Sequence, residues 1–132
     1  MKNIKRNIIA ITISLLIPTL AAADLNVFAC EPEWAALAEE IGAGADKTSS
    51  ATHALQDPHY IQARPSLISK VRKADIVICS GAQLEIGWLP MLLNKGSNPG
   101  VMPGKPGHII AGDFVRRLDV PSRVDRAQGD VH

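Results

Sequence analysis

The run Ile76-Val77-Ile78-Cys79 is the most strongly β-branched stretch of this 132-residue chain. A short run of this kind is typical of a central strand in a parallel sheet, where both faces are covered. Parallel strands need long connections, which are usually helices. The chain on either side of this run should therefore alternate strands with helices.

The sequence before this run fits that alternation. Residues 25–30 form an apolar, β-rich stretch that predicts a buried strand. Pro32 suits the first helical position, an apolar face with helical spacing runs from Trp34 to Ile41, and Gly42 is a stop signal. Residues 45–54 alternate weakly and predict a short second strand.

The remaining elements follow the same order. Pro65 predicts the start of a helix with Leu67, Ile68 and Val71 on its inner face, closed by residues 74–75. After the turn at residues 80–81, apolar residues between 84 and 92 predict a further helix. Residues 95–107, rich in glycine and proline, predict a loop, and residues 108–112 predict a fourth strand.

This order predicts an α/β fold, with a doubly wound, roughly four-stranded parallel sheet flanked by helices. In such a sheet ligands lie outside the carboxyl ends of the strands. The first strand usually lies beside the third, which would bring Cys30 and Cys79 within bonding reach. A disulfide and a pair of buried, reduced thiols are both compatible with that geometry.

The N-terminal segment predicts export of the chain. Lys2, Lys5 and Arg6 precede an apolar stretch at residues 8–20, and an Ala-x-Ala pattern ends at Ala23. We therefore assign residues 1–23 to a secretory signal peptide, which leaves 24–132 in a compartment that permits disulfides and without a stable membrane span. The formal charge of +1, without a long basic run, gives no support for nucleic-acid binding.

The absence of certain short motifs argues against several classes of function. The chain has no G-x-G-x-x-G, P-loop or G-x-S-x-G pattern, so nucleotide-binding and serine-hydrolase functions lack support. Glu31, Glu33 and Glu85 are candidates for acid–base work, although acids at helix starts usually complement the helix dipole. Trp34 and Trp88 are expected to belong to the core.

His59 is the candidate binding residue. It lies in the polar loop Gln56-Asp57-Pro58-His59-Tyr60, between the second strand and the helix at Pro65. An imidazole on a loop suits a zinc ion, and the alternative is a solvated loop histidine. His53, His108 and His132 show no H-x-x-H or H-E-x-x-H spacing, so His59 needs ligands from elsewhere.

Several stretches together resemble one protein family. They are 25–34 (LNVFACEPEW), 54–60 (ALQDPHY), 64–66 (RPS), 73–78 (KADIVI) and 81–85 (GAQLE). In this order they resemble the periplasmic zinc- and manganese-binding proteins of metal ABC importers (cluster A-I), and the resemblance covers 24–132.

The resemblance implies both a function and an incomplete fold. It implies that His59 is the first metal ligand, that the metal is zinc or alternatively manganese, and that the protein is a monomeric receptor and not an enzyme. Such a receptor delivers its metal to an inner-membrane ABC permease. Family members have two α/β lobes joined by a long helix, so 24–132 would be the N-terminal lobe, truncated before that helix. His132 would then precede the segment with the second histidine ligand. The alternatives are a secreted zinc-dependent enzyme and a metal-independent adhesion or interaction module.

Overall fold

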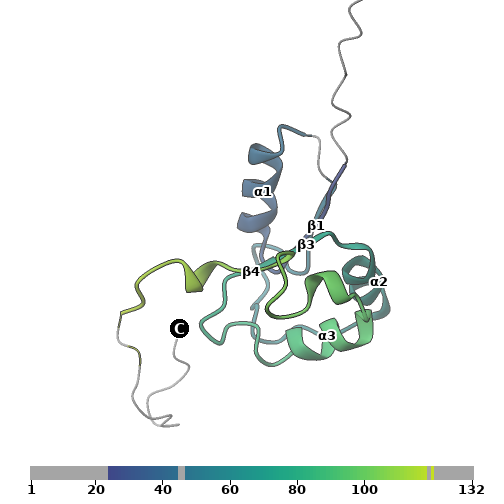
Figure 1. The fold of residues 1–132 in the computed structure, drawn as a ribbon. Coiled ribbons are helices and arrows are strands. Elements are labelled where there is room, and N and C mark those ends of the chain that lie inside the picture. The colour runs from purple at the N-terminus through teal and green to yellow at the C-terminus, as the bar shows by residue number, and fades with distance from the viewer. Residues whose placement is uncertain (1–23, 45–46, 119, 121–132) are drawn as a thin grey trace, which may run out of the picture.

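The computed structural model describes residues 24–44, 47–118 and 120 (Figure 1). The signal peptide assigned to residues 1–23, and His132, lie outside these residues. The elements in chain order are β1 (Asn26–Ala29), α1 (Pro32–Ile41), β2 (Lys47–Ser50), α2 (Pro65–Lys73), β3 (Ile76–Cys79), α3 (Leu89–Gly96), η1 (Pro99–Val101), β4 (His108–Ile110) and η2 (Ala111–Asp113). Within the described part of the chain, no helix is both long and apolar enough to cross a membrane.

The four strands form one parallel sheet in the order β2-β1-β3-β4. This confirms the predicted α/β fold, including the position of the first strand beside the third. The apolar strands β1 and β3 occupy the centre, and β2, with the polar sequence Lys-Thr-Ser-Ser, forms an edge. An edge strand has only one neighbour and tolerates polar side chains, which explains why the pattern of β2 was weak in the sequence.

The helices cover the two faces of the sheet unequally. Figure 1 shows α1 on one side of the strands and α2 and α3 on the other. The core lies on the second side, where Leu67 and Val71 of α2 and Leu92 of α3 pack in one cluster with Phe28 and Val77 of the central strands. No residue of α1 is buried. The sheet therefore has one closed face and one face that α1 covers only in part.

The third helix begins later than its apolar pattern predicts. The pattern starts at Leu84, but α3 runs from Leu89 to Gly96. Ala82 and Gln83 have positive φ angles of 53° and 76°, which a right-handed helix does not contain. Residues 82–88 form turns instead. The predicted loop at 95–107 was also too long, because α3 includes its first two residues and η1 lies inside it.

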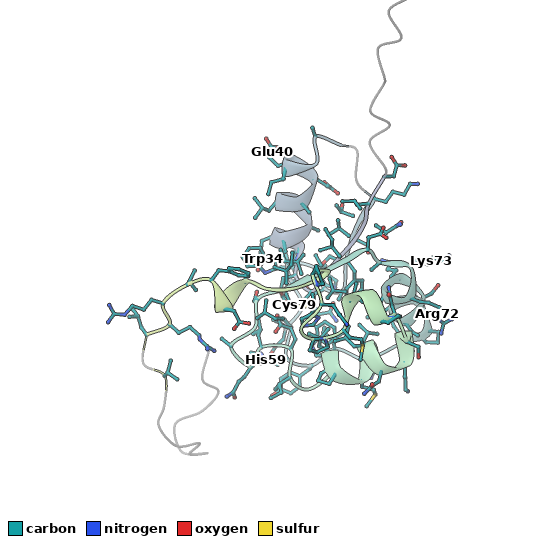
Figure 2. The ribbon with its side chains drawn as sticks, viewed as in Figure 1. Trp34, Glu40, His59, Arg72, Lys73 and Cys79 are labelled. Atoms are coloured by element: carbon teal, nitrogen blue, oxygen red, sulfur yellow. A yellow bond between two sulfur atoms is a disulfide. The ribbon has the colours of Figure 1, made fainter. Side chains whose placement is uncertain are left out.

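Asn98 connects the two helices of the closed face. Its Nδ2 donates to the carbonyl oxygens of Val71 at 3.0 Å and Ala74 at 2.7 Å, at the end of α2. Its Oδ1 accepts from the backbone N–H of Gly100 at 3.1 Å. Arg72, at the exposed end of α2 (Figure 2), donates to the carbonyl oxygen of Gly96 in α3 at 3.4 Å. These bonds supply donors to carbonyl groups at the C-terminal ends of α2 and α3, where the helical hydrogen-bond pattern stops.

Candidate metal site at the carboxyl edge of the sheet

The carboxyl edge of the sheet is built from segments that are distant in sequence. The segment after β1 begins at Cys30, the loop after β2 covers residues 51–64, and the turn after β3 begins at Ser80. The N–H groups of Ala51 and Thr52 bond to the carbonyl oxygens of Ala29 and Cys30, and the Thr52 hydroxyl donates to the latter at 3.0 Å. The start of the histidine loop is therefore attached to the central strand.

His59 is oriented by the aspartate two residues before it. The Nδ1 atom of His59 lies 2.6 Å from Oδ1 of Asp57, and the same oxygen accepts the backbone N–H of His59 at 3.0 Å. The side chain of His59 is 24% exposed. A carboxylate at Nδ1 favours the tautomer with its proton on Nδ1, which leaves the lone pair on Nε2. Histidines that bind metals commonly have this arrangement.

Trp88 fixes the histidine loop from the other side. Its indole Nε1 donates to the carbonyl oxygen of Pro58 at 2.7 Å, and its side chain is buried, as predicted. A Cβ atom added to Gly87 would lie 3.4 Å from the carbonyl oxygen of His59. The backbone around His59 therefore lies directly against the turn that precedes α3.

Cys30 and Cys79 form a disulfide across the two central strands. Their Cα atoms are 4.8 Å apart, and both residues are fully buried. Their predicted proximity is confirmed, and of the two possibilities left open the structure contains the disulfide.

Two glutamates meet beside this disulfide. Oε2 of Glu31 accepts from the backbone N–H and the hydroxyl of Ser80, at 3.2 Å and 3.0 Å. The carboxylate of Glu85 accepts from the N–H groups of Ser80 at 2.8 Å and of Gly81 at 3.0 Å. Both glutamates are about 3% exposed. Gly81 has a φ of +80°, and a Cβ there would lie 2.3 Å from Cγ2 of Ile110, so this turn requires glycine.

Burial changes the protonation of this pair. Burial, followed by the nearby charge and the hydrogen bond of Glu85, raises the pKa of Glu31 from 4.5 to about 8, against the opposing effect of the bonds from Ser80. At neutral pH Glu31 is therefore mainly protonated and donates to Glu85. Oε1 of Glu31 meets no donor among the described residues. The two carboxyl groups thus share the proton that Glu31 carries.

The pairing of Glu31 with Glu85 was not predicted from the sequence. Glu31 does stand at the start of α1, but its side chain makes no capping bond to the helix, whereas Glu33 is an exposed acid of the first turn. The available signal was position: Glu31 directly follows the apolar strand β1, and Glu85 lies six residues after β3 ends at Cys79. Trp34, predicted to be core, is only half-buried and donates from Nε1 to the Ser80 hydroxyl at 2.8 Å (Figure 2).

The other histidines do not join His59. His53 is exposed in the same loop. His108 begins β4, at the amino end of the sheet, and its Nδ1 lies 2.9 Å from the carbonyl oxygen of Val101. Within residues 24–44, 47–118 and 120, His59 is therefore the histidine at this edge that a carboxylate orients.

A parallel α/β lobe with an oriented histidine beyond the carboxyl ends of its strands has the architecture of a ligand-binding lobe. Comparison with known protein families identifies the family to which this lobe belongs. Residues 27–113 match the family described as the periplasmic component A of the zinc-uptake complex (ZnuA). The chain belongs to this family.

One of the similar solved structures supports the fold. A crystal structure of ZnuA superposes with a TM-score of 0.51 at 21% identity, covering 57% of this chain and 28% of that protein. A periplasmic metal-binding protein from Candidatus Liberibacter asiaticus gives 0.48 at 22% identity, covering 53% and 27%. The chain thus spans little more than a quarter of the length of these proteins. No curated protein sequence matches it.

Proposed function

We propose that this chain is the metal-capturing, N-terminal lobe of a periplasmic receptor for a divalent transition metal, and that His59 is its metal ligand. The observation that carries this proposal is the 2.6 Å contact between Nδ1 of His59 and the Asp57 carboxylate, at the edge where parallel α/β sheets bind ligands. Membership of the zinc-uptake family supports the proposal.

Zinc is the metal that this ligand favours. Imidazole nitrogen suits zinc better than manganese, which prefers oxygen ligands. A complete zinc site needs about three or four protein ligands. One described histidine therefore supplies only part of a site, and the remaining ligands would come from a second lobe joined to this one by a long helix. Manganese is the alternative metal.

The proposed receptor works by capture and delivery, without catalysis. It would be exported by the signal peptide at residues 1–23, bind zinc in the periplasm as a monomer and pass it to an inner-membrane ABC permease. Apolar side chains of α1 are left uncovered, since Leu37 and Ile41 are 45% and 77% exposed. This exposure suits a lobe that packs against another part of the same protein. Scattered exposure of apolar side chains is normal, but these two lie one turn apart on one helix.

The test is a zinc titration of the full chain, followed by the NMR shifts of the histidine ring nitrogens. Zinc should shift Nε2 of His59 first. His59→Ala should abolish most of the binding, and Asp57→Asn should weaken it because the ring loses its orienting carboxylate. His53→Ala is the matched control, since His53 is an exposed histidine in the same loop. Equal zinc affinity in wild type and His59→Ala would refute the assignment.

The same samples separate this proposal from its rivals. A secreted zinc-dependent enzyme needs an open coordination position and a general base beside the metal. An adhesion module needs no metal, so its binding partner would be retained equally by wild type and His59→Ala. Zinc-dependent turnover of ester or peptide substrates, lost in His59→Ala, would favour the enzyme.

A further inference from the structure

The disulfide and the buried glutamates together form a second group of metal-ligating side chains. The sulfur atoms of Cys30 and Cys79 and a carboxylate oxygen of Glu85 all lie within 4.8 Å of one another. All three residues are buried. They are supplied by the ends of the two central strands and by the turn after β3. We propose that in the dithiol form of the chain these three side chains bind one thiophilic divalent cation, such as zinc, at a site separate from His59.

The distances suit a small tetrahedral ion. Zinc lies about 2.3 Å from thiolate sulfur and about 2.0–2.2 Å from carboxylate oxygen, which places neighbouring ligand atoms roughly 3.3–3.8 Å apart. The three ligand atoms already lie within 4.8 Å of one another while the sulfurs are bonded. Once the bond is broken, the two sulfurs can move apart by rotation of the cysteine side chains about χ1.

A second observation points to a missing cation at the same place. Oε1 of Glu31 is buried without a hydrogen-bond donor, while Oε2 of the same group accepts from the Ser80 N–H that also binds Glu85. The ion pairs found among the described residues join Lys47 to Asp24 and His59 to Asp57, so no lysine, arginine or histidine in that part of the chain neutralises the buried glutamates. Buried carboxylates normally pair with a cation or coordinate a metal. The unpartnered oxygen of Glu31 therefore lies in the same buried turn as Glu85.

The cation requires a change in the redox state of the sulfurs. A dithiol that reduces the disulfide breaks the Cys30–Cys79 bond, delivers two electrons and two protons, and leaves as its own disulfide. The cation then displaces both thiol protons to solvent and binds two thiolates. A newly made chain, before oxidation, is already in the dithiol form. Oxidation of the sulfurs would expel the ion, so the bridge and the metal exclude each other.

Cobalt(II) provides the direct test, because its thiolate complexes absorb in the near ultraviolet and tetrahedral sites absorb in the visible. The full chain is reduced with a phosphine, which leaves as its oxide, desalted without oxygen and titrated with cobalt. The reduced chain should give a two-thiolate spectrum, and the oxidised chain none. Cys79→Ser should halve the charge-transfer absorption. Glu85→Gln should weaken cobalt binding by at least about tenfold.

Control variants separate this site from others. Glu40→Gln changes an exposed glutamate of α1 and should bind cobalt as the wild type does. His59→Ala should also leave the thiolate spectrum unchanged, so failure of the proposed receptor function and failure of this site are distinguishable. Absence of a thiolate band in the reduced wild type would overturn the proposal, as would a Glu85→Gln variant with wild-type affinity.

Alkylation gives a measurement that does not depend on the variants folding. Zinc should slow the labelling of Cys30 and Cys79 by iodoacetamide in the reduced, otherwise unmodified chain, because bound thiolates are shielded. Equal labelling with and without zinc would also overturn the proposal.

Discussion

Glu31 should make the stability of this protein depend on pH in an unusual direction. Its folded-state pKa of about 8 lies above the ordinary value of 4.5. Below pH 4.5 the carboxyl group is protonated in both the folded and the unfolded chain, and its stabilising effect is fully present. As the pH rises towards 8 the unfolded chain releases the proton while the folded chain keeps it, so the free energy of unfolding must fall.

The size of the effect follows from the two pKa values. Each pH unit between them corresponds to about 1.36 kcal/mol, so the whole window amounts to something on the order of 5 kcal/mol. Between pH 5 and pH 8 the loss should be roughly 4 kcal/mol. This is a large part of the stability of an ordinary domain, which is about 5–15 kcal/mol. The chain should therefore be markedly more stable in mildly acidic solution than at pH 8.

Urea unfolding of the oxidised chain at several pH values between 5 and 8 measures this loss. Glu31→Gln keeps the shape of the side chain and a donor for Glu85 but cannot titrate, so its free energy of unfolding should be nearly constant over the window. Glu40→Gln, which removes an exposed glutamate, should retain the wild-type slope. If wild type and Glu31→Gln lose stability in parallel, the shared proton is not the cause.

Three further predictions concern stability at constant pH. Replacing both Cys30 and Cys79 by serine opens a cross-link between residues 49 positions apart, and chemical denaturation should show a loss of roughly 4 kcal/mol. Asn98→Ala removes the cap at the end of α2 and should cost about 2 kcal/mol, whereas an unchanged melting temperature would mean that water replaces the amide. Gln83→Gly relieves a left-handed conformation at an exposed position and should raise the stability by about 0.5–1 kcal/mol in the same assay; a lower melting temperature would contradict this.

The fold was predictable to the extent that it depends on local patterns. Apolar strands at residues 25–30 and 76–79, separated by helices, determine a parallel sheet, and general rules of topology place the first strand beside the third. The start of α3 was not predictable in this way. It is delayed by left-handed residues and by the bonds from Glu85 to the backbone after β3, which an apolar pattern does not record.

The candidate site was likewise predictable only where it depends on residues close together in the sequence. His59 stood out because it lies in a polar loop beside Asp57, and a contact between residues two positions apart can be inferred from sequence. The pairing of Glu31 with Glu85 could not be inferred, because it depends on tertiary contacts across 54 positions that bury both carboxyl groups. Each residue alone is an ordinary acid near the start of a helix or turn.

The strand order also determines how the protein can assemble during synthesis. β2 joins β1, β3 then joins the other side of β1, and β4 joins β3, so each strand adds to an edge that is still exposed. When the chain emerges from its N-terminus, each new strand can therefore join the sheet without separating two strands that are already hydrogen-bonded. Residues 1–132 contain two cysteines, so oxidation within this stretch can form one internal disulfide. Premature oxidation, before Cys79 has emerged, can link Cys30 only to another molecule. The yield of the Cys30–Cys79 bridge should therefore depend on the timing of oxidation.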